Sequence, residues 1–300
     1  MQFYERLYLR SDRWEGHVLN TIIAAPKLAV AHLTALELAP TEWVVEAARA
    51  GFDAVGLRLN PTSPGAIAYA SPVGSPAHLD LRRVLVDEGM TVHDVEFIPM
   101  LPDIDVASYA PMFDAAADLG ARCVTVSGDD PNASRLAANL AALCELAAKY
   151  GLRVDLEFMR WRHVATLQQA RSIVESVGSA NLAVLVDALH LTRSGGNPDD
   201  VRALPAGMVR AVQLCDASPN DPVGDDATIL EARTGRLPPG EGALPLSELL
   251  DALPADTAFS VEMPLPSLPA RDRLKLAYRS TRNMLDAARL RRESRGASCQ

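Results

Sequence analysis

Four polar side chains occupy equivalent places in this sequence, each at the end of a short apolar segment. The clearest case is the stretch NLAVLVDALHLTRSGG at residues 181–196, where an apolar run ends in Asp187 and His190 follows three residues later. An ionised carboxylate at the edge of a core needs a partner, because its removal from water is costly. A lone aspartate of this kind is commonly a helix N-cap. The pattern recurs, however, at Glu157, Gln213 and Glu262.

Brought together, three carboxylates and one amide oxygen would repel one another unless they bound a cation. Sites rich in oxygen ligands suit hard divalent ions such as Mg²⁺ or Mn²⁺, with Co²⁺ and Zn²⁺ as alternatives. A metal of this kind stabilises the negative charge that develops when a proton is removed next to a carbonyl, and a nearby carboxylate acts as the base. We therefore predict one divalent metal site formed by Glu157, Asp187, Gln213 and Glu262.

Eight strand-like segments, each followed by a helix-like segment, must position these side chains. Such an alternation predicts a parallel sheet, and eight units close into a (β/α)8 TIM barrel. An open doubly wound sheet is the alternative, but no GxGxxG motif follows any strand. The strands are expected at residues 32–38, 53–59, 91–97, 122–128, 152–158, 182–186, 209–217 and 258–264. The helices are expected near residues 40–51, 79–89, 106–120, 132–150, 164–177, 198–204, 246–253 and 271–290.

The two-residue period of a strand predicts which side chains face the barrel interior. In the last strand, the large side chains of Phe259 and Val261 share one face, while Ser260 and Glu262 lie on the other. The large residues belong under the helices, so the smaller set should face inward. The same reasoning turns Glu157, Asp187 and Gln213 inward at the carboxyl ends of their strands, where barrel active sites lie.

The remaining segments define the expected domain boundaries. Residues 1–27 are interpreted as an N-terminal extension, residues 28–291 as a single barrel domain and residues 292–300 as a C-terminal tail. Residues 218–243, which are rich in glycine and proline, are expected to form a long loop that could cover the barrel mouth.

Composition narrows the cellular setting and the partners. The net charge of −9 gives little electrostatic support for a nucleic-acid partner. The N-terminus has no apolar segment typical of a signal peptide, and no apolar run is long enough to span a membrane. The four cysteines show no CxxC motif or disulfide framework, which favours a reducing compartment. We expect a cytoplasmic protein without a membrane or nucleic-acid partner, and a homo-oligomer remains open.

Around these residues the sequence resembles the xylose isomerase-like TIM barrels, a superfamily of sugar isomerases, epimerases, related dehydratases and endonuclease IV. The resemblance covers residues 28–290, with intervals of 30, 26 and 49 residues between the four ligand positions. Its carriers are LEF at Glu157, VDALH at Asp187, VQLCDA at Gln213, PGEG at 239–242 and VEMP at Glu262. The resemblance implies that the four positions bind one metal ion, that Glu157 and Glu262 also move the substrate proton, and that His190 contacts substrate oxygens.

The sequence also departs from parts of that family. Many epimerases have histidine at the position of Gln213, and glutamine there is familiar from dehydratases of the inosose and 3-dehydroshikimate type. The substrate-side glutamate and arginine of the ketose epimerases would fall on His163 and Pro219. The three-metal site of endonuclease IV needs many histidines, and this chain has only six.

The resemblance implies a metal-dependent isomerase or epimerase of a sugar, or of a sugar-like polyol or keto acid. Its reaction would abstract a proton next to a carbonyl and form a metal-bound enediolate. A metal-dependent dehydratase (a lyase) is the first alternative, and a non-catalytic sugar-binding barrel is the second. The partner is then a small carbohydrate or polyol-derived molecule. The candidate contacts for it are His190, Glu96, Arg58, Arg160, Arg233 and Asp216.

Overall fold

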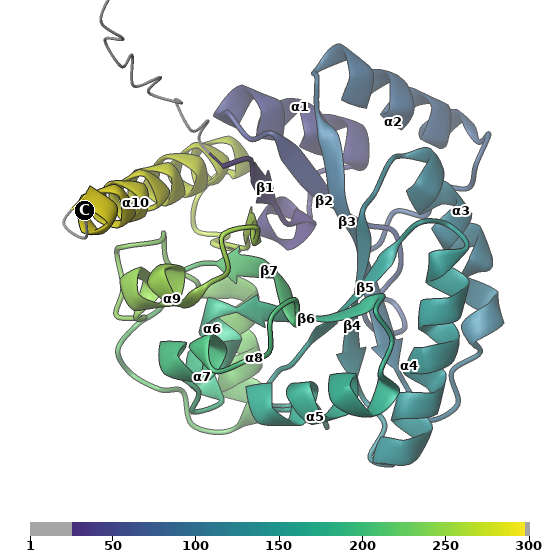
Figure 1. The fold of residues 1–300 in the computed structure, drawn as a ribbon. Helices are drawn as coiled ribbons and strands as arrows, with labels where there is room; N and C mark the ends of the chain where they lie inside the picture. Colours follow the sequence, from purple (N-terminus) through teal and green to yellow (C-terminus); the bar gives the residue numbers. More distant parts are fainter. Residues whose placement is uncertain (1–25, 298–300) are drawn as a thin grey trace, which may run out of the picture.

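The computed structural model describes residues 26–297, which form a closed barrel of eight parallel strands surrounded by helices (Figure 1). Each strand pairs with the next along the chain, and β8 closes the barrel against β1. This topology confirms the predicted (β/α)8 TIM barrel. The strands are β1 (Leu28–Val30), β2 (Ala54–Arg58), β3 (Thr91–Met100), β4 (Cys123–Gly128), β5 (Arg153–Glu157), β6 (Leu182–Asp187), β7 (Val209–Leu214) and β8 (Ala258–Val261).

The helices lie outside the barrel and begin at residues that suit a helix N-terminus. Ser75, Asn132 and Thr166 each accept a hydrogen bond from a backbone N–H of the first turn that follows them. The helices are α1 (Pro40–Ala50), α2 (Pro76–Asp87), α3 (Ala110–Asp118), α4 (Ala133–Ala148), α5 (Leu167–Val177), α6 (Ala188–Arg193), α7 (Pro198–Arg202), α8 (Asp225–Thr234), α9 (Leu246–Ala252) and α10 (Ala270–Ala297), with 3-10 turns η1 (His32–Ala35) and η2 (Val106–Tyr109).

The barrel interior is narrow and polar, as the alternation along the strands predicts. Thr125 of β4 donates a hydrogen bond to Asp94 of β3 across 3.0 Å. Gly56 of β2 lies against these groups, because a Cβ atom added there would be 2.7 Å from Asp94 Oδ1 and 3.1 Å from Glu96 Oε1. Glycine at position 56 therefore makes room for two buried carboxylates inside the barrel.

The first strand differs from its predicted position. The expected strand at residues 32–38 is wrong, since β1 ends at Val30 and the 3-10 turn η1 follows. The reason lies in the buried His32, whose Nδ1 accepts from the backbone N–H of Arg58 at 3.1 Å and whose Nε2 lies 3.0 Å from the carbonyl oxygen of Leu38. His32 thus bonds the backbone on both sides, and the apolar residues near it belong to a packed loop.

The predicted loop at residues 218–243 is also wrong in part, because it contains the ten-residue helix α8. The glycines and prolines of the segment lie outside the helix, and Asp225 and Asp226 occupy its first turn, where acidic side chains favour a helix. The short helix α6 was likewise not predicted, and it begins directly after β6. The last helix continues to Ala297, into the residues interpreted as a tail.

No helix within residues 26–297 has the length and apolar content needed to cross a membrane. The expectations for the N-terminal extension and for a signal peptide concern residues that, apart from Pro26 and Lys27, lie outside the described part of the chain.

Candidate metal and active site

The four predicted ligands lie at the carboxyl ends of four consecutive strands. Glu157 and Asp187 are the last residues of β5 and β6, Gln213 is next to last in β7, and Glu262 follows β8 directly. Asp187 and Gln213 are paired residues in the parallel ladder, so their side chains leave the sheet side by side. All four side chains are buried. The parallel barrel therefore gathers them at one mouth.

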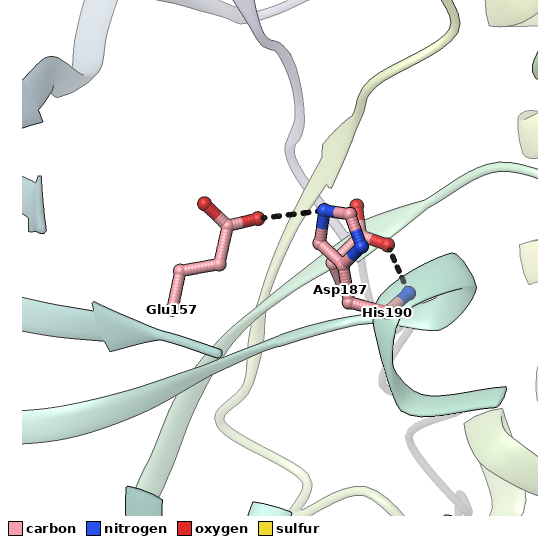
Figure 2. A group of neighbouring side chains, drawn as sticks. All are labelled: Glu157, Asp187 and His190. Atoms are coloured by element: carbon pink, nitrogen blue, oxygen red, sulfur yellow. Dashed lines mark hydrogen bonds and ion pairs between the residues drawn. The ribbon is translucent and has the colours of Figure 1, made fainter. Parts of the chain in front are cut away.

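His190 joins two of these carboxylates in a compact group (Figure 2). One candidate ligand atom from each of Glu157, Asp187 and His190 can be chosen so that all three lie within 4.8 Å of one another. The Nε2 atom of His190 is 3.7 Å from Glu157 Oε1. The backbone N–H of His190 donates a hydrogen bond to Asp187 Oδ1 at 2.9 Å. Asp187 is therefore the N-cap of α6 as well as a member of the group. This link explains the interval of three residues between Asp187 and His190.

Arg236 is the main member of the site that the sequence analysis missed. Its guanidinium group lies between two of the predicted ligands, with Nη1 2.5 Å from Asp187 Oδ2 and Nη2 2.7 Å from Glu262 Oε2. Its Nε donates to the carbonyl oxygen of Ala232 in the last turn of α8 at 2.8 Å. The side chain is 1 % exposed, so these ion pairs are buried.

The electrostatic environment shifts the pKa of each acid in the group. Burial raises the pKa of Glu157 well above its usual value, and the charges of Glu262 and Asp187 add to the effect. Burial also raises the pKa of Glu262, to about 7, although Arg236 opposes the shift. Burial acts in the same direction on Asp187, but Arg236 and His190 together outweigh it and the pKa of Asp187 is lowered. Burial lowers the pKa of His190 to about 4, so its imidazole is neutral at physiological pH.

Two observations on these residues fit a divalent cation. Within the described residues, Glu157 Oε1 and Gln213 Oε1 are buried and accept no hydrogen bond, although buried polar atoms are seldom left unpaired. The buried side chains of the site also include four carboxylates (Glu96, Glu157, Asp187 and Glu262) and two guanidinium groups (Arg58 and Arg236), a formal excess of two negative charges, while the less buried Arg162 and Arg233 also line the cavity. Oxygen donors with this charge suit a hard divalent ion.

A cavity of about 230 Å³ opens above the group and gives a small molecule access to it. Glu157, Gln213 and Glu262 line this cavity, and so do three of the predicted substrate contacts besides His190: Arg58, Glu96 and Arg233. Arg58 and Glu96 form a buried ion pair with an Nη2–Oε2 distance of 2.6 Å, while Arg233 is exposed at the mouth. The apolar part of the wall consists of Leu33, Leu36, Ile67, Phe97, Met159 and Trp161.

Two predicted substrate contacts, Arg160 and Asp216, do not line this cavity. The guanidinium group of Arg160 contacts Asp221 at 2.9 Å and the carbonyl oxygen of Pro222 at 2.6 Å, so it fixes the segment before α8. The carboxylate of Asp216 accepts hydrogen bonds from the backbone N–H groups of Gly240 and Leu244, each at 2.9 Å. Both side chains hold the segment between β7 and β8 in place.

Curated relatives match part of this chain. A 3-dehydroshikimate dehydratase of Pseudomonas aeruginosa is 32 % identical over 143 residues, which are 46 % of this chain and 22 % of the relative. An inosose isomerase of Halalkalibacterium halodurans is 31 % identical over 150 residues, which are 47 % of this chain and 51 % of the relative. The matches therefore span about half of the second relative and less of the first.

Solved structures match the fold over most of its length. The zinc-bound IolI protein superposes with a TM-score of 0.71 at 19 % identity, covering 87 % of this chain and 99 % of that chain. A 3-dehydroshikimate dehydratase, AsbF of Bacillus anthracis, superposes with a TM-score of 0.65 at 16 % identity, covering 84 % of this chain and 97 % of that chain.

The family assignment rests on the match that covers most of the sequence. The model of the family described as xylose isomerase-like TIM barrel matches residues 44–287, a range that includes all of the strands from β2 to β8. With its closed eight-stranded parallel barrel, this chain belongs to the xylose isomerase-like TIM barrel family.

Proposed function

We propose that this protein is a divalent-metal-dependent isomerase or epimerase that moves a proton next to the carbonyl of a small sugar or polyol-derived ketone. The observation that carries the proposal is the pair of carboxyl groups with raised pKa values, Glu157 and Glu262, which line one cavity. A general acid–base catalyst works best when its pKa lies near the operating pH, and in the metal-free site burial raises the pKa of Glu262 to about 7.

The cation would be held by Glu157, Asp187, Gln213 and Glu262, with His190 close by. Once bound, it would supply positive charge that polarises the substrate carbonyl and favours the ionised form of the surrounding carboxyl groups. Glu157 ends β5 and Glu262 follows β8, three strands further around the barrel, and both line the cavity, so one could remove a proton from the substrate carbon and the other return one. His190 lines the cavity with a neutral imidazole, which suits a hydrogen bond to a substrate hydroxyl.

A dehydratase is the second candidate, and two observations favour it. Gln213 lines the cavity, as in the dehydratase pattern noted above, and the 3-dehydroshikimate dehydratase of Pseudomonas aeruginosa is 32 % identical over its matched part. The same proton removal leads to dehydration when the substrate carries a hydroxyl on the next carbon. The exposed Arg233 at the mouth is suitable for binding the carboxylate of such a substrate.

We also infer a cytoplasmic location. Three cysteines, Cys123, Cys144 and Cys215, are free and buried in the described structure. Free thiols of this kind are compatible with a reducing compartment.

The test is an exchange experiment on purified, Mn²⁺-loaded protein in D₂O. Inososes, keto-sugars and 3-dehydroshikimate are incubated separately and followed by NMR. Deuterium incorporation at carbon without loss of water supports the isomerase or epimerase, whereas a conjugated product supports the dehydratase. Glu157→Gln is the inactive control, and Glu248→Gln on the exposed face of α9 controls for the loss of a carboxylate elsewhere. The absence of both deuterium exchange and water loss with all of these substrates would contradict the proposal.

A further inference from the structure

Arg236 occupies the place between Asp187 and Glu262 that the proposed cation would need. Its Nη1 and Nη2 atoms each contact one carboxylate oxygen, at 2.5 and 2.7 Å. The other oxygen of Asp187 already accepts the backbone N–H of His190 at 2.9 Å. Both oxygens of Asp187 are therefore bound, in contrast to Glu157 Oε1 and Gln213 Oε1, which have no hydrogen-bond partner in the described chain.

A guanidinium group and a divalent ion cannot share these oxygens without strong repulsion. Metal–oxygen bonds of this class are about 2.0–2.6 Å long. With Nη1 2.5 Å from Asp187 Oδ2, an ion on the same oxygen would lie within about 5 Å of the guanidinium group. Like charges at that separation repel strongly in a buried site, where water screens them weakly.

We propose that Arg236 is an internal counter-ion of the metal site, which compensates Asp187 and Glu262 when no metal is bound and competes with the metal for them. The inference depends on the metal site of the proposed function. Entry of the cation breaks at least one of the two ion pairs of Arg236. The guanidinium group can remain tethered, because its Nε donates to the carbonyl oxygen of Ala232 and not to a carboxylate.

The charges of the site allow Arg236 and the cation to replace each other as partners of the two carboxylates. With Arg236 in place, Asp187 and Glu262 each have a cationic partner, at 2.5 and 2.7 Å, so their charges are compensated in the metal-free site. Arg236 also lines the cavity, and a guanidinium group released from a carboxylate has space on that side. The metal-free and metal-bound sites can thus both be folded, with Arg236 paired differently in each.

The test compares metal affinity in two matched variants. Arg236→Met removes the bridging guanidinium group, and Arg58→Met removes another buried guanidinium group that lines the same cavity but is paired with Glu96. Chelator-treated proteins are titrated with Mn²⁺ and followed by calorimetry and by the EPR signal of free Mn²⁺. Arg236→Met should bind Mn²⁺ at least about tenfold more tightly than the unchanged protein, and Arg58→Met, whose guanidinium group is paired with Glu96, should show a smaller increase.

Thermal unfolding gives a second readout that does not depend on activity. Without metal, Arg236→Met should unfold at a lower temperature than the unchanged protein, and saturating Mn²⁺ should close most of that gap. If this variant does not fold without metal, it is purified with Mn²⁺ and the rate of Mn²⁺ release to a chelator is measured instead, with slower release expected. Arg236→Lys, which keeps the charge but cannot bridge both carboxylates, should bind Mn²⁺ with intermediate affinity.

The outcomes separate this inference from the proposed function. Equal Mn²⁺ affinity in the unchanged protein and in Arg236→Met would overturn the role of Arg236 and leave the metal site standing. An equal increase in both methionine variants would also overturn it, since the effect would then be general loss of positive charge. If no form of the protein bound Mn²⁺, the metal site itself would be refuted, and the inference would fall with it.

Discussion

Replacing Glu262 by glutamine tests the electrostatics of the site, because it removes one carboxyl group whose pKa is raised to about 7 in the folded protein. The ordinary pKa of this group is 4.5. Between these values the folded protein holds a proton that the unfolded chain has released. Stability contributed by this group is therefore present at low pH and is lost as the pH rises through this interval. In Glu262→Gln this loss is absent.

The difference between these two pKa values corresponds to about 3 kcal/mol, most of which falls between pH 5 and pH 8. The pH dependence of the stability of the unchanged protein does not show the contribution of Glu262 directly. Burial lowers the pKa values of His32, His93 and His190 to about 4, and a lowered histidine pKa makes stability rise as the pH rises toward 6.5. The difference between the variant and the unchanged protein cancels the contributions of these histidines.

The assay is urea unfolding in the presence of a chelator at pH 5, 6, 7 and 8. Relative to the unchanged protein, Glu262→Gln should gain about 2–3 kcal/mol of stability between pH 5 and pH 8, which corresponds to a relative shift of about 5 °C in a thermal scan. Glu248→Gln, an exposed control on α9, should show a constant difference. A constant difference for Glu262→Gln as well would refute the reasoning, because Glu262 would then titrate in the folded protein as it does in the unfolded chain.

Three further changes test other contacts of the site. Asp187→Asn should destabilise the metal-free protein by about 3 kcal/mol in urea unfolding, since Arg236 then loses a buried anionic partner, and unchanged stability would contradict the ion pair. Glu157→Gln should slow deuterium exchange into substrate by about 100-fold or more, and an unchanged exchange rate would exclude Glu157 from proton transfer. The unfolding temperature of this variant in chelator should hold or rise, because the substitution removes a carboxyl group that neighbouring carboxylates repel. Asp216→Ala should lower stability by about 1–3 kcal/mol, because the N–H groups of Gly240 and Leu244 lose their acceptor, and a variant as stable as the unchanged protein would show that these bonds do not fix the segment.

The barrel and the positions of the four predicted ligands at the strand ends could be predicted because both follow from local periodicity. Side chains alternate along a strand, and parallel strands end at the same edge, so Glu157, Asp187, Gln213 and Glu262 had to converge. The same criterion gave the wrong position for the first strand. Residues 32–38 have the leucine content expected of a strand, but the buried His32 forms hydrogen bonds with the backbone of Arg58 and Leu38. The contact with Arg58 spans 26 residues, so the local sequence carries no signal for it.

The helix α8 escaped prediction because glycine and proline dominate the composition of residues 218–243 as a whole. These residues are confined to the two sides of the helix, whereas residues 225–234 contain none of them. Averaging over the whole segment therefore hid a short stretch of ordinary helix-forming residues.

Arg236 shows why the cations of this site were harder to predict than its anions. The carboxylates are fixed by the strands that carry them, whereas Arg236 reaches the site only because α8 ends at Thr234 and lies against the barrel mouth. That placement depends on Arg193, which contacts Glu231 of α8 at 2.7 Å, and on Arg160, which contacts the segment before it. Arg233, three residues earlier, remains exposed at the mouth. The charge that balances the proposed metal site is thus set by how the segment between β7 and β8 is anchored, and we expect a change in those anchors to alter metal affinity without a change in any of the four predicted ligands.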